Sequence, residues 1–126
     1  MQPVNLFALA SQQAQWLSVR QTTVAGNIAN ANTPGYGTMD VQPFEAVLNQ
    51  KTVPMRATHP MHVSTAGTPA EFTVRQDNQD KPLMPSGNSV VLETELMKSG
   101  EVRRSFELNA AIVKSFHRML MMTTRS

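Results

Sequence analysis

The sequence of 126 residues contains no cysteine, which excludes disulfide bonds, thiolate metal sites and cysteine nucleophiles. Aromatic residues make up only 6% and hydrophobic residues 40% of the chain, so a single core would be thin. No apolar run approaches the roughly 18 residues of a membrane span. The N-terminal segment MQPVNLFALASQQ lacks the basic and continuously apolar regions of a cleaved signal peptide. We therefore expect one domain, residues 1–126, with no membrane span and no cleaved signal peptide.

A strong charge of one sign is also missing, because 11 basic residues against 9 acidic ones give a net charge of +2. The basic excess lies in residues 96–126, where six basic residues stand against two acidic ones: Lys98, Arg103, Arg104, Lys114, Arg118 and Arg125 against Glu101 and Glu107. Along a helix this pattern is more typical of a solvated face than of a phosphate-binding stripe. We expect no nucleic acid as a partner, and keep a small basic helical nucleic-acid-binding protein as the alternative.

Proline is nearly absent from both ends of the chain, since seven of the eight prolines lie between residues 34 and 85. A helix interior rejects proline at a cost of about 3 kcal/mol. The sequence therefore predicts a mainly α fold with two long terminal helices. We expect an N-terminal helix and its end in residues 1–33, an irregular, Pro-rich middle with little β structure in residues 34–87, and a C-terminal helix in residues 88–126.

Each predicted helix carries a stripe of small and apolar residues spaced alternately about three and four apart, which is typical of a coiled-coil seam. In the N-terminal helix the stripe contains, besides the polar Gln21, the residues Phe7, Ala10, Ala14, Leu17, Val24 and Ile28. In the C-terminal helix it contains Leu92, Leu96, Val102, Phe106, Ala110, Val113, Phe116 and Leu120. We expect a coiled-coil-like pair, either antiparallel within the chain or formed with copies in other subunits.

Turn and capping residues mark the end of the N-terminal helix and the start of the C-terminal helix. Pro34 and Gly35 fit the central positions of a type II turn, in which glycine takes a positive φ, and the residue before a proline is disfavoured in a helix. Asn88 or Ser89 is expected to cap the start of the C-terminal helix.

The middle of the chain gives weaker signals. Residues 43–48 (PFEAVL) suggest one or two helical turns with Pro43 at the first position. Residues 71–75 (EFTVR) alternate as in a short strand. Residues 76–87 are polar with two prolines, and we expect a mobile loop there.

The residue patterns of common catalytic sites are missing. There is no nucleophile elbow, phosphate loop, dinucleotide fingerprint or carboxylate pair suited to acid–base chemistry. His59 and His62 are the best candidates for metal ligands, but a zinc site needs more donors than these two. We expect no enzyme, no catalytic residue, no metal, no cofactor and no small-molecule substrate; a metal-dependent or peptidoglycan-active enzyme using these histidines is the alternative.

Two features near the C-terminus concern packing. His117 lies within the apolar arc of the predicted helix, and we expect it to be partly buried. A methionine cluster can serve either helix-end packing or adaptable apolar contact with a partner: Met119, Met121 and Met122.

Residues 24–36, VAGNIANANTPGY, resemble the N-terminal signature of the bacterial flagellar rod and hook family, which has an Asn-Ile/Leu-Ala-Asn core followed by Thr-x-Gly-Tyr/Phe. The signature falls on Asn27, Ile28, Ala29, Asn30, Asn32, Thr33, Pro34, Gly35 and Tyr36. Segments 87–97 and 115–120 also resemble family members, as do Arg20, Asp40 and Phe44. Gly37 departs from the family, in which lysine or arginine commonly follows the tyrosine. Within the family the resemblance is closest to a short proximal-rod protein, with the sister proximal-rod protein FlgC as the alternative.

The resemblance implies a structural subunit of the proximal rod in the flagellar basal body. Such a subunit is exported to the periplasm by the flagellar type III system without a cleaved signal, and polymerises through its terminal helices into the rod that transmits torque from the MS ring. The implied partners are other copies of itself, FlgC and neighbouring rod proteins, the MS-ring adaptor FliE and the type III export gate. We expect its termini to be disordered before assembly, because burial of such thin seams is deferred to polymerisation.

The resemblance also implies an export-gate motif, Phe-x-x-x-hydrophobic, which Phe44 and Leu48 match. These two residues are equally the i, i+4 pair of a short helix. The asparagines at positions 27, 30 and 32 likewise have two interpretations: they shape the end of the helix and its turn, or they bond to stacked subunits.

Overall fold

The computed structural model describes residues 6–49, 61, 72–77 and 83–125. Along the chain the elements are α1 (Leu6–Ala29), β1 (Met39–Val41), α2 (Phe44–Asn49), β2 (Val74–Gln76) and α3 (Leu92–Thr124). The predictions of a mainly helical protein, of long N- and C-terminal helices and of little strand are confirmed. His59, His62 and residues 50–60, 62–71 and 78–82 of the Pro-rich middle lie outside the described residues.

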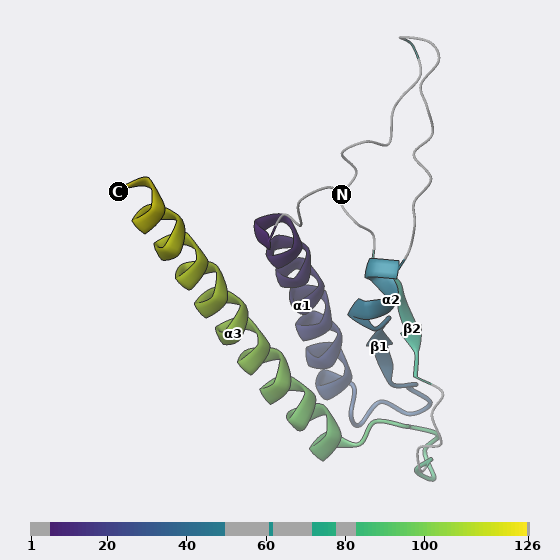
Figure 1. Ribbon diagram of the computed structural model, residues 1–126. Helices are drawn as coiled ribbons and strands as arrows, with labels where there is room; N and C mark the ends of the chain where they lie inside the picture. The colour runs from purple at the N-terminus through teal and green to yellow at the C-terminus, as the bar shows by residue number, and fades with distance from the viewer. Residues whose placement is uncertain (1–5, 50–60, 62–71, 78–82, 126) are drawn as a thin grey trace.

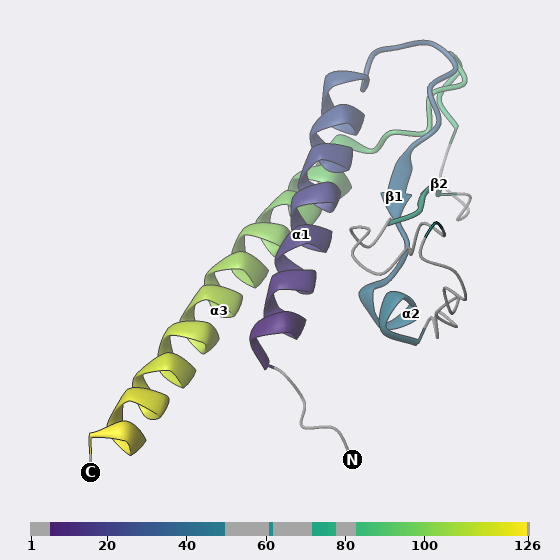
Figure 2. The same ribbon diagram turned by 90° about the horizontal axis from the view of Figure 1, so that it is seen from above.

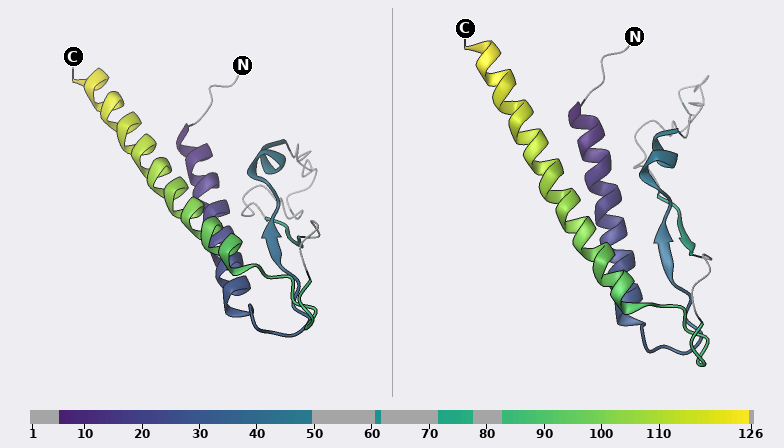
Figure 3. Two further views of the ribbon diagram at one scale, coloured as in Figure 1. Left: turned by 90° about the horizontal axis from the view of Figure 1, so that it is seen from below. Right: turned by 60° about the horizontal axis from the view of Figure 1, so that its bottom comes forward.

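The two long helices lie side by side and antiparallel, and they diverge towards the two ends of the chain (Figures 1 and 3). Three contacts define the antiparallel register. Near the start of α1, Phe7 meets Phe116 edge to face with ring centroids 5.3 Å apart. Further along, the Asn109 side-chain amide donates to the carbonyl of Ala10 at 3.0 Å. At the other end Asn27 of α1 bonds to Glu95 of α3.

In α1, the helix face towards α3 and β1 follows a seven-residue repeat. Ala10, Leu17 and Val24, all in the predicted stripe, are buried. Phe7 is 38% exposed and Gln21 is exposed, whereas Asn27, outside the stripe, is fully buried. The inward face therefore changes from apolar to polar where α1 approaches its end.

In α3, the face towards α1 differs from the predicted stripe. The buried residues are Glu95 and Val102, and Phe106, Val113 and Phe116 are half-buried. The predicted stripe residues that are exposed in this chain are Leu92, Leu96, Ala110 and Leu120. An apolar pattern could not identify the first inward turns of α3, because these turns present charged side chains to α1.

Two smaller expectations about α3 were wrong. Its N-cap residue is Val91, which makes no side-chain cap hydrogen bond, so neither Asn88 nor Ser89 caps this helix. His117 is exposed rather than partly buried, because it lies beyond Phe116 where α3 extends past the start of α1.

A small antiparallel sheet packs on α1, which lies between α3 and the sheet in Figure 2, and Lys98 of α3 reaches Asp40 of β1 directly. Its register pairs Met39 with Gln76, Asp40 with Arg75 and Val41 with Val74. β1 was not predicted from the sequence, and the predicted strand at residues 71–75 is displaced to Val74–Gln76. The predicted helical turns at residues 43–48 are confirmed as α2, which begins one residue after Pro43.

The buried apolar side chains of the described residues are few and small: Ala10, Leu17, Val24, Val41, Val47, Val90 and Val102. This core is thin and contains no aromatic ring, as the composition suggested. Among the helices that the structure describes, none combines the length and apolar character required to cross a bilayer.

Candidate functional site

The residues of the family signature and the segment before α3 form a polar joint at the base of the helix pair. Its first part is a tight turn after α1, in which the Tyr36 N–H donates to the Thr33 carbonyl at 3.3 Å. Gly35 has φ 74°, as expected for the third position of a type II turn. The predicted turn is therefore confirmed, and it returns the chain towards α1.

A second turn, residues 84–87, lies directly against the first. The Gly35 N–H donates to the Ser86 carbonyl at 2.9 Å, and Gly87 also has a positive φ, 79°. A Cβ atom on Gly87 would lie 3.5 Å from the Gly35 Cα. This is an ordinary van der Waals distance, so it is the left-handed backbone conformation, and not a lack of space, that favours glycine at both positions.

Asn88 connects these turns to the end of α1. Its side chain is 1% exposed, and its amide nitrogen lies 2.9, 3.0 and 2.8 Å from the carbonyl oxygens of Asn30, Ala31 and Thr33. Its amide oxygen accepts from the Val90 N–H at 2.7 Å. These three carbonyls belong to the turn residues that follow α1, whereas the carbonyls of Gly26, Asn27 and Ile28 in its last turn accept from the backbone N–H groups of Asn30 and Ala31. Asn88 therefore holds the turn after α1 from the far side of the sequence, instead of capping the start of its own helix.

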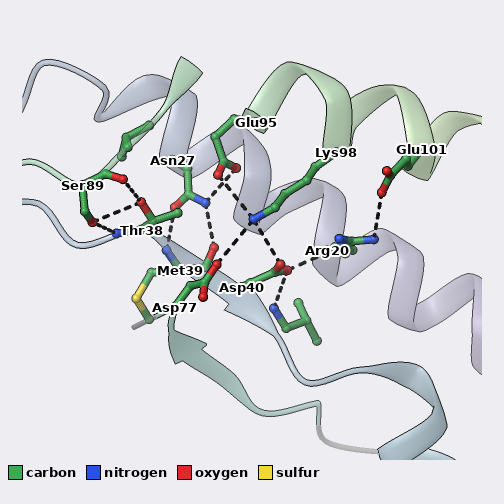
Figure 4. Close-up of polar contacts among 12 residues, drawn as sticks. Arg20, Asn27, Thr38, Met39, Asp40, Asp77, Ser89, Glu95, Lys98 and Glu101 are labelled. Carbon is green, nitrogen blue, oxygen red and sulfur yellow. Dashed lines mark hydrogen bonds and ion pairs between the residues drawn. The ribbon is translucent and has the colours of Figure 1, made fainter. Parts of the chain in front are cut away.

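Asn27 is the centre of the joint and is fully buried. Its amide nitrogen donates to the Met39 carbonyl at 2.7 Å and to Glu95 Oε2 at 3.0 Å. Its amide oxygen accepts from the Met39 N–H at 3.0 Å and from the Tyr36 hydroxyl at 3.4 Å. The side-chain amide pairs with both backbone groups of Met39, as a neighbouring strand would. Asn27 thus holds together α1, the outer edge of β1 and α3 (Figure 4).

Thr38 and Ser89 join the two segments that lead into β1 and α3. The Thr38 N–H donates to Ser89 Oγ at 2.9 Å, and the Thr38 hydroxyl donates to the Ser89 carbonyl at 2.7 Å. The Ser89 N–H in turn donates to the Tyr36 carbonyl at 3.1 Å. With these bonds, every buried side-chain nitrogen and oxygen in the described part of the chain has a partner.

A charged network extends from Asn27 along the interface (Figure 4). Lys98 Nζ lies 3.2 Å from Asp40, 3.5 Å from Glu95 and 3.8 Å from Asp77. Arg20 reaches Asp40 at 3.5 Å and Glu101 at 3.9 Å. Arg20 of α1 and Lys98 of α3 therefore bind carboxylates of three segments. These carboxylates belong to Glu95 and Glu101 of α3, to Asp40 of β1 and to Asp77, the residue after β2.

The electrostatics of Lys98 follow from this environment. Burial by itself lowers the pKa of the ammonium group, but Asp40, which also accepts its hydrogen bond, together with Glu95 and Asp77, outweighs that effect. The net result is that the pKa of Lys98 is raised above 10.5. Lys98 therefore remains charged in the folded chain and balances the fully buried Glu95.

Some residues of the family signature are buried in the joint and others are exposed on the surface. Asn27 is buried. The side-chain amide nitrogen of Asn30 donates to the Gly26 carbonyl at 2.8 Å, and its amide oxygen accepts from the Thr33 hydroxyl at 3.0 Å. Ile28 and Tyr36 are half-buried. The exposed members are Ala29, Asn32, Thr33, Pro34 and Gly35. In this chain the amides of Asn27 and Asn30 shape the joint, and Asn32 is the signature asparagine whose side chain is exposed.

Sequence reasoning missed four contributors to the joint: Thr38, Asn88, Glu95 and Lys98. Asn88 was predicted only as a cap of the C-terminal helix, whereas Glu95 lies in the segment 87–97 that resembles family members and Lys98 directly follows this segment. Arg20 and Asp40, matched as flanking residues, form an ion pair with each other.

The candidate export motif lies at a second contact, on the same side of α1 as β1. The Trp16 indole N–H donates to the Gln42 carbonyl at 2.7 Å, and the Trp16 and Phe44 rings are 5.7 Å apart at 49°. Arg20 lies over the Trp16 ring at 5.5 Å. Phe44 is half-buried in this cluster, whereas Leu48 is 47% exposed.

Neither contact region resembles a catalytic or metal centre. Within the ranges that the structure describes, no three His, Asp or Glu side chains form a group suited to holding a metal ion. What both regions do is fix the relative positions of helices and loops.

Comparison with known proteins identifies the family. Residues 8–36 match the family model described as "Flagella basal body rod protein". The chain is 50% identical over 129 aligned residues to "Flagellar basal body rod protein FlgB" of Agrobacterium fabrum (strain C58 / ATCC 33970), an alignment that covers 99% of this chain and 96% of the relative. These matches favour neither FlgC nor a nucleic-acid-binding protein. The chain belongs to the flagellar basal body rod protein family.

Proposed function

We propose that this protein is a structural subunit of the flagellar basal body rod, as the name of its Agrobacterium relative suggests, and that its place is the proximal part of the rod, as the resemblance in sequence implies. The observation that carries the proposal is the polar joint itself. Residues of the family signature hold two long helices antiparallel, and Asn27 among them bonds to β1 and α3. A rigid helix pair is a suitable building unit for a tube that transmits torque, and this function needs no catalytic group.

Polymerisation would use the helix faces that the single chain leaves open. Large apolar side chains along α3 remain exposed, including the predicted seam residues Leu92 at 48%, Leu96 at 56% and Leu120 at 42%. Exposed apolar side chains in such numbers are characteristic of interaction surfaces. Further copies of this chain, FlgC and other rod proteins, and the MS-ring adaptor FliE are the neighbours that would cover them.

Delivery to the periplasm would use the flagellar type III export gate, without a cleaved signal. Phe44 and Leu48 are the proposed recognition residues. The thin core supports this route, because its buried apolar side chains are alanine, valine and leucine, and such a domain is easily unfolded for export. We treat residues 1–126 as one rod-subunit domain whose ends become ordered on assembly.

Deletion of the gene followed by electron microscopy of isolated basal bodies tests the assignment. We expect MS rings without rods and non-motile cells, both restored by the unsubstituted gene. Intact rods in motile deletion cells would overturn the proposal.

The export role has a separate test. Replacing Phe44 and Leu48 together by alanine should abolish secretion of the chain, whereas replacing the exposed Glu45 and Asn49 in the same helix should not. Normal secretion of the Phe44→Ala/Leu48→Ala chain would remove the export role while leaving the rod assignment intact.

A further inference from the structure

We propose that Trp16 masks the export motif, so that the folded chain is not recognised by the export gate until α2 separates from α1. This inference rests on the export role proposed above for Phe44 and Leu48. It adds a regulatory contact to that role: the same aromatic pair that fixes α2 in the folded subunit would conceal half of its recognition motif.

The contacts of α2 explain the masking. Phe44 packs its ring against Trp16 at a centroid distance of 5.7 Å, and the Trp16 indole binds the Gln42 carbonyl two residues earlier. Val47, between the two motif residues, is buried. Leu48 remains 47% exposed whereas Phe44 is half-buried, so the folded chain presents one of the two motif side chains only in part.

The contact is also easily opened. α2 has six residues, and a helix this short is not stable without tertiary contacts. Its contacts with the other described elements are sparse, whereas α1 packs extensively on both α3 and β1. Opening α2 therefore leaves the helix pair and the polar joint intact.

The position of Trp16 couples masking to folding. Trp16 lies in the middle of α1, and Arg20, one turn later, covers its ring while bonding to Asp40 of β1. Trp16 and Phe44 thus meet only when α1 is helical and β1 is docked against it. A chain that is unfolded in the cytoplasm exposes both motif residues, and folding after export conceals Phe44.

The affinity of the gate for the folded chain would be reduced by the fraction of chains in which α2 is open. Removing the aromatic contact should raise that fraction. Loss of an aromatic pair should increase the equilibrium constant for opening of α2 by roughly two- to tenfold.

The test measures binding of the purified full-length chain to the purified cytoplasmic domain of the flagellar export gate. Trp16→Ala should bind roughly two- to tenfold more tightly than the unsubstituted chain. Ser18→Ala, at an exposed position on the same helix, is the matched control and should not change the affinity. Circular dichroism must show equal helix content, so that tighter binding reflects opening of α2 alone.

A second measurement covers the case in which Trp16→Ala unfolds α1. Trp16 is the one tryptophan of the chain, so fluorotryptophan labelling gives a single fluorine NMR signal. Addition of the gate domain should shift this signal to the position of solvent-exposed tryptophan.

The outcomes separate this inference from the export role. A gate-bound chain with an unchanged fluorine signal, or a folded Trp16→Ala chain with unchanged affinity, overturns masking. Unchanged binding of the Phe44→Ala/Leu48→Ala chain, or no binding by any variant, overturns the export role on which masking rests.

Discussion

At the scale of single residues, Asn27 shows how a side chain substitutes for a strand. A carboxamide has the same N–H donor and C=O acceptor as a peptide group, and Asn27 uses them to pair with both backbone groups of Met39. Its second N–H satisfies the buried Glu95. An asparagine in a helix interior is usually neutral or unfavourable, so its presence here is explained by tertiary contacts.

Removing this amide should be costly. Asn27→Ala removes the partner of both backbone groups of Met39 and of the buried Glu95 Oε2, while Glu95 Oε1 keeps Lys98, and we expect a loss of about 2–4 kcal/mol in unfolding free energy. Urea unfolding followed by circular dichroism measures the loss. Asn32→Ala, at an exposed signature position, is the control and should cost less than about 0.5 kcal/mol. Equal unfolding midpoints for the two variants would contradict the role of Asn27.

Lys98 makes a pH-dependent contribution whose sign follows from its pKa. Because the pKa in the folded chain is raised above 10.5, the folded state holds this proton more tightly than the unfolded state. The contribution is therefore fully present below about pH 10.5 and is lost as the pH rises through the higher folded value. We expect the unfolding free energy of Lys98→Gln to be about 2 kcal/mol lower than that of the unsubstituted chain at neutral pH. This difference between the two chains should decrease only in strong alkali.

The measurement is unfolding free energy against pH for both chains, with Lys114→Gln at an exposed position as the control. If the difference in unfolding free energy between the unsubstituted chain and Lys98→Gln stays unchanged above the ordinary lysine pKa, Lys98 does not act through its charge.

At the scale of elements, the ends of the helices depend on distant segments. The turn after α1 is held by Asn88, whose amide binds carbonyls 55 to 58 residues away, while α3 has Val91 as its N-cap residue and no side-chain cap. The turn after α1 therefore cannot adopt its native geometry until the segment before α3 is in place. Folding of the two helices is coupled through this joint rather than only through their apolar faces.

Two glycines in different elements should respond oppositely to alanine. Gly100 is inside α3 with nothing within 4 Å of a new Cβ, so Gly100→Ala should stabilise the chain by about 1 kcal/mol. Gly35 has φ 74° in the turn, so Gly35→Ala should destabilise it by about 1–2 kcal/mol although space is available. Thermal unfolding of both variants measures this. Shifts of the same sign would contradict the assigned backbone conformations.

At the scale of the whole molecule, the described elements form three layers, with α1 between α3 and the small sheet (Figure 2). α1 is thus covered on two sides, whereas α3 contacts the rest of the chain along one face. This asymmetry leaves α3 as the principal surface for neighbouring subunits, and it separates residues that stabilise the chain from residues available for assembly.

Two substitutions on α3 should separate these roles. Val102 is 1% exposed, so Val102→Ala should lower the unfolding free energy by about 1–3 kcal/mol. Leu96 is 56% exposed, so Leu96→Ser should change it by less than about 0.5 kcal/mol and still reduce motility and the yield of rods. Urea unfolding and electron microscopy of basal bodies provide the two readouts. Full motility with Leu96→Ser would remove this position from the proposed seam.

Several features could be predicted because they depend on neighbours in the sequence. Proline-free ends predict long helices, Pro34–Gly35 predicts the turn, and the segment 43–48, with Pro43 at its first position, predicts α2. The stripe of α3 was misplaced in its first turns because periodicity detects apolar faces, and there the inward positions are Glu95 and Lys98. β1 was missed because three residues are too few to establish an alternation.

The sequence by itself therefore determined the helical character of both ends, the turn that follows α1 and, through the signature at residues 24–36, the family. Only the tertiary structure decided which partners the polar residues take. Asn27 and Glu95 are 68 residues apart, and Thr38 and Ser89 are 51 apart. A hydrogen bond depends on distance and direction in space, and neither is encoded in the local pattern around an asparagine. Burial of charge likewise became visible only when the carboxylates of β1 and α3 were brought around Lys98.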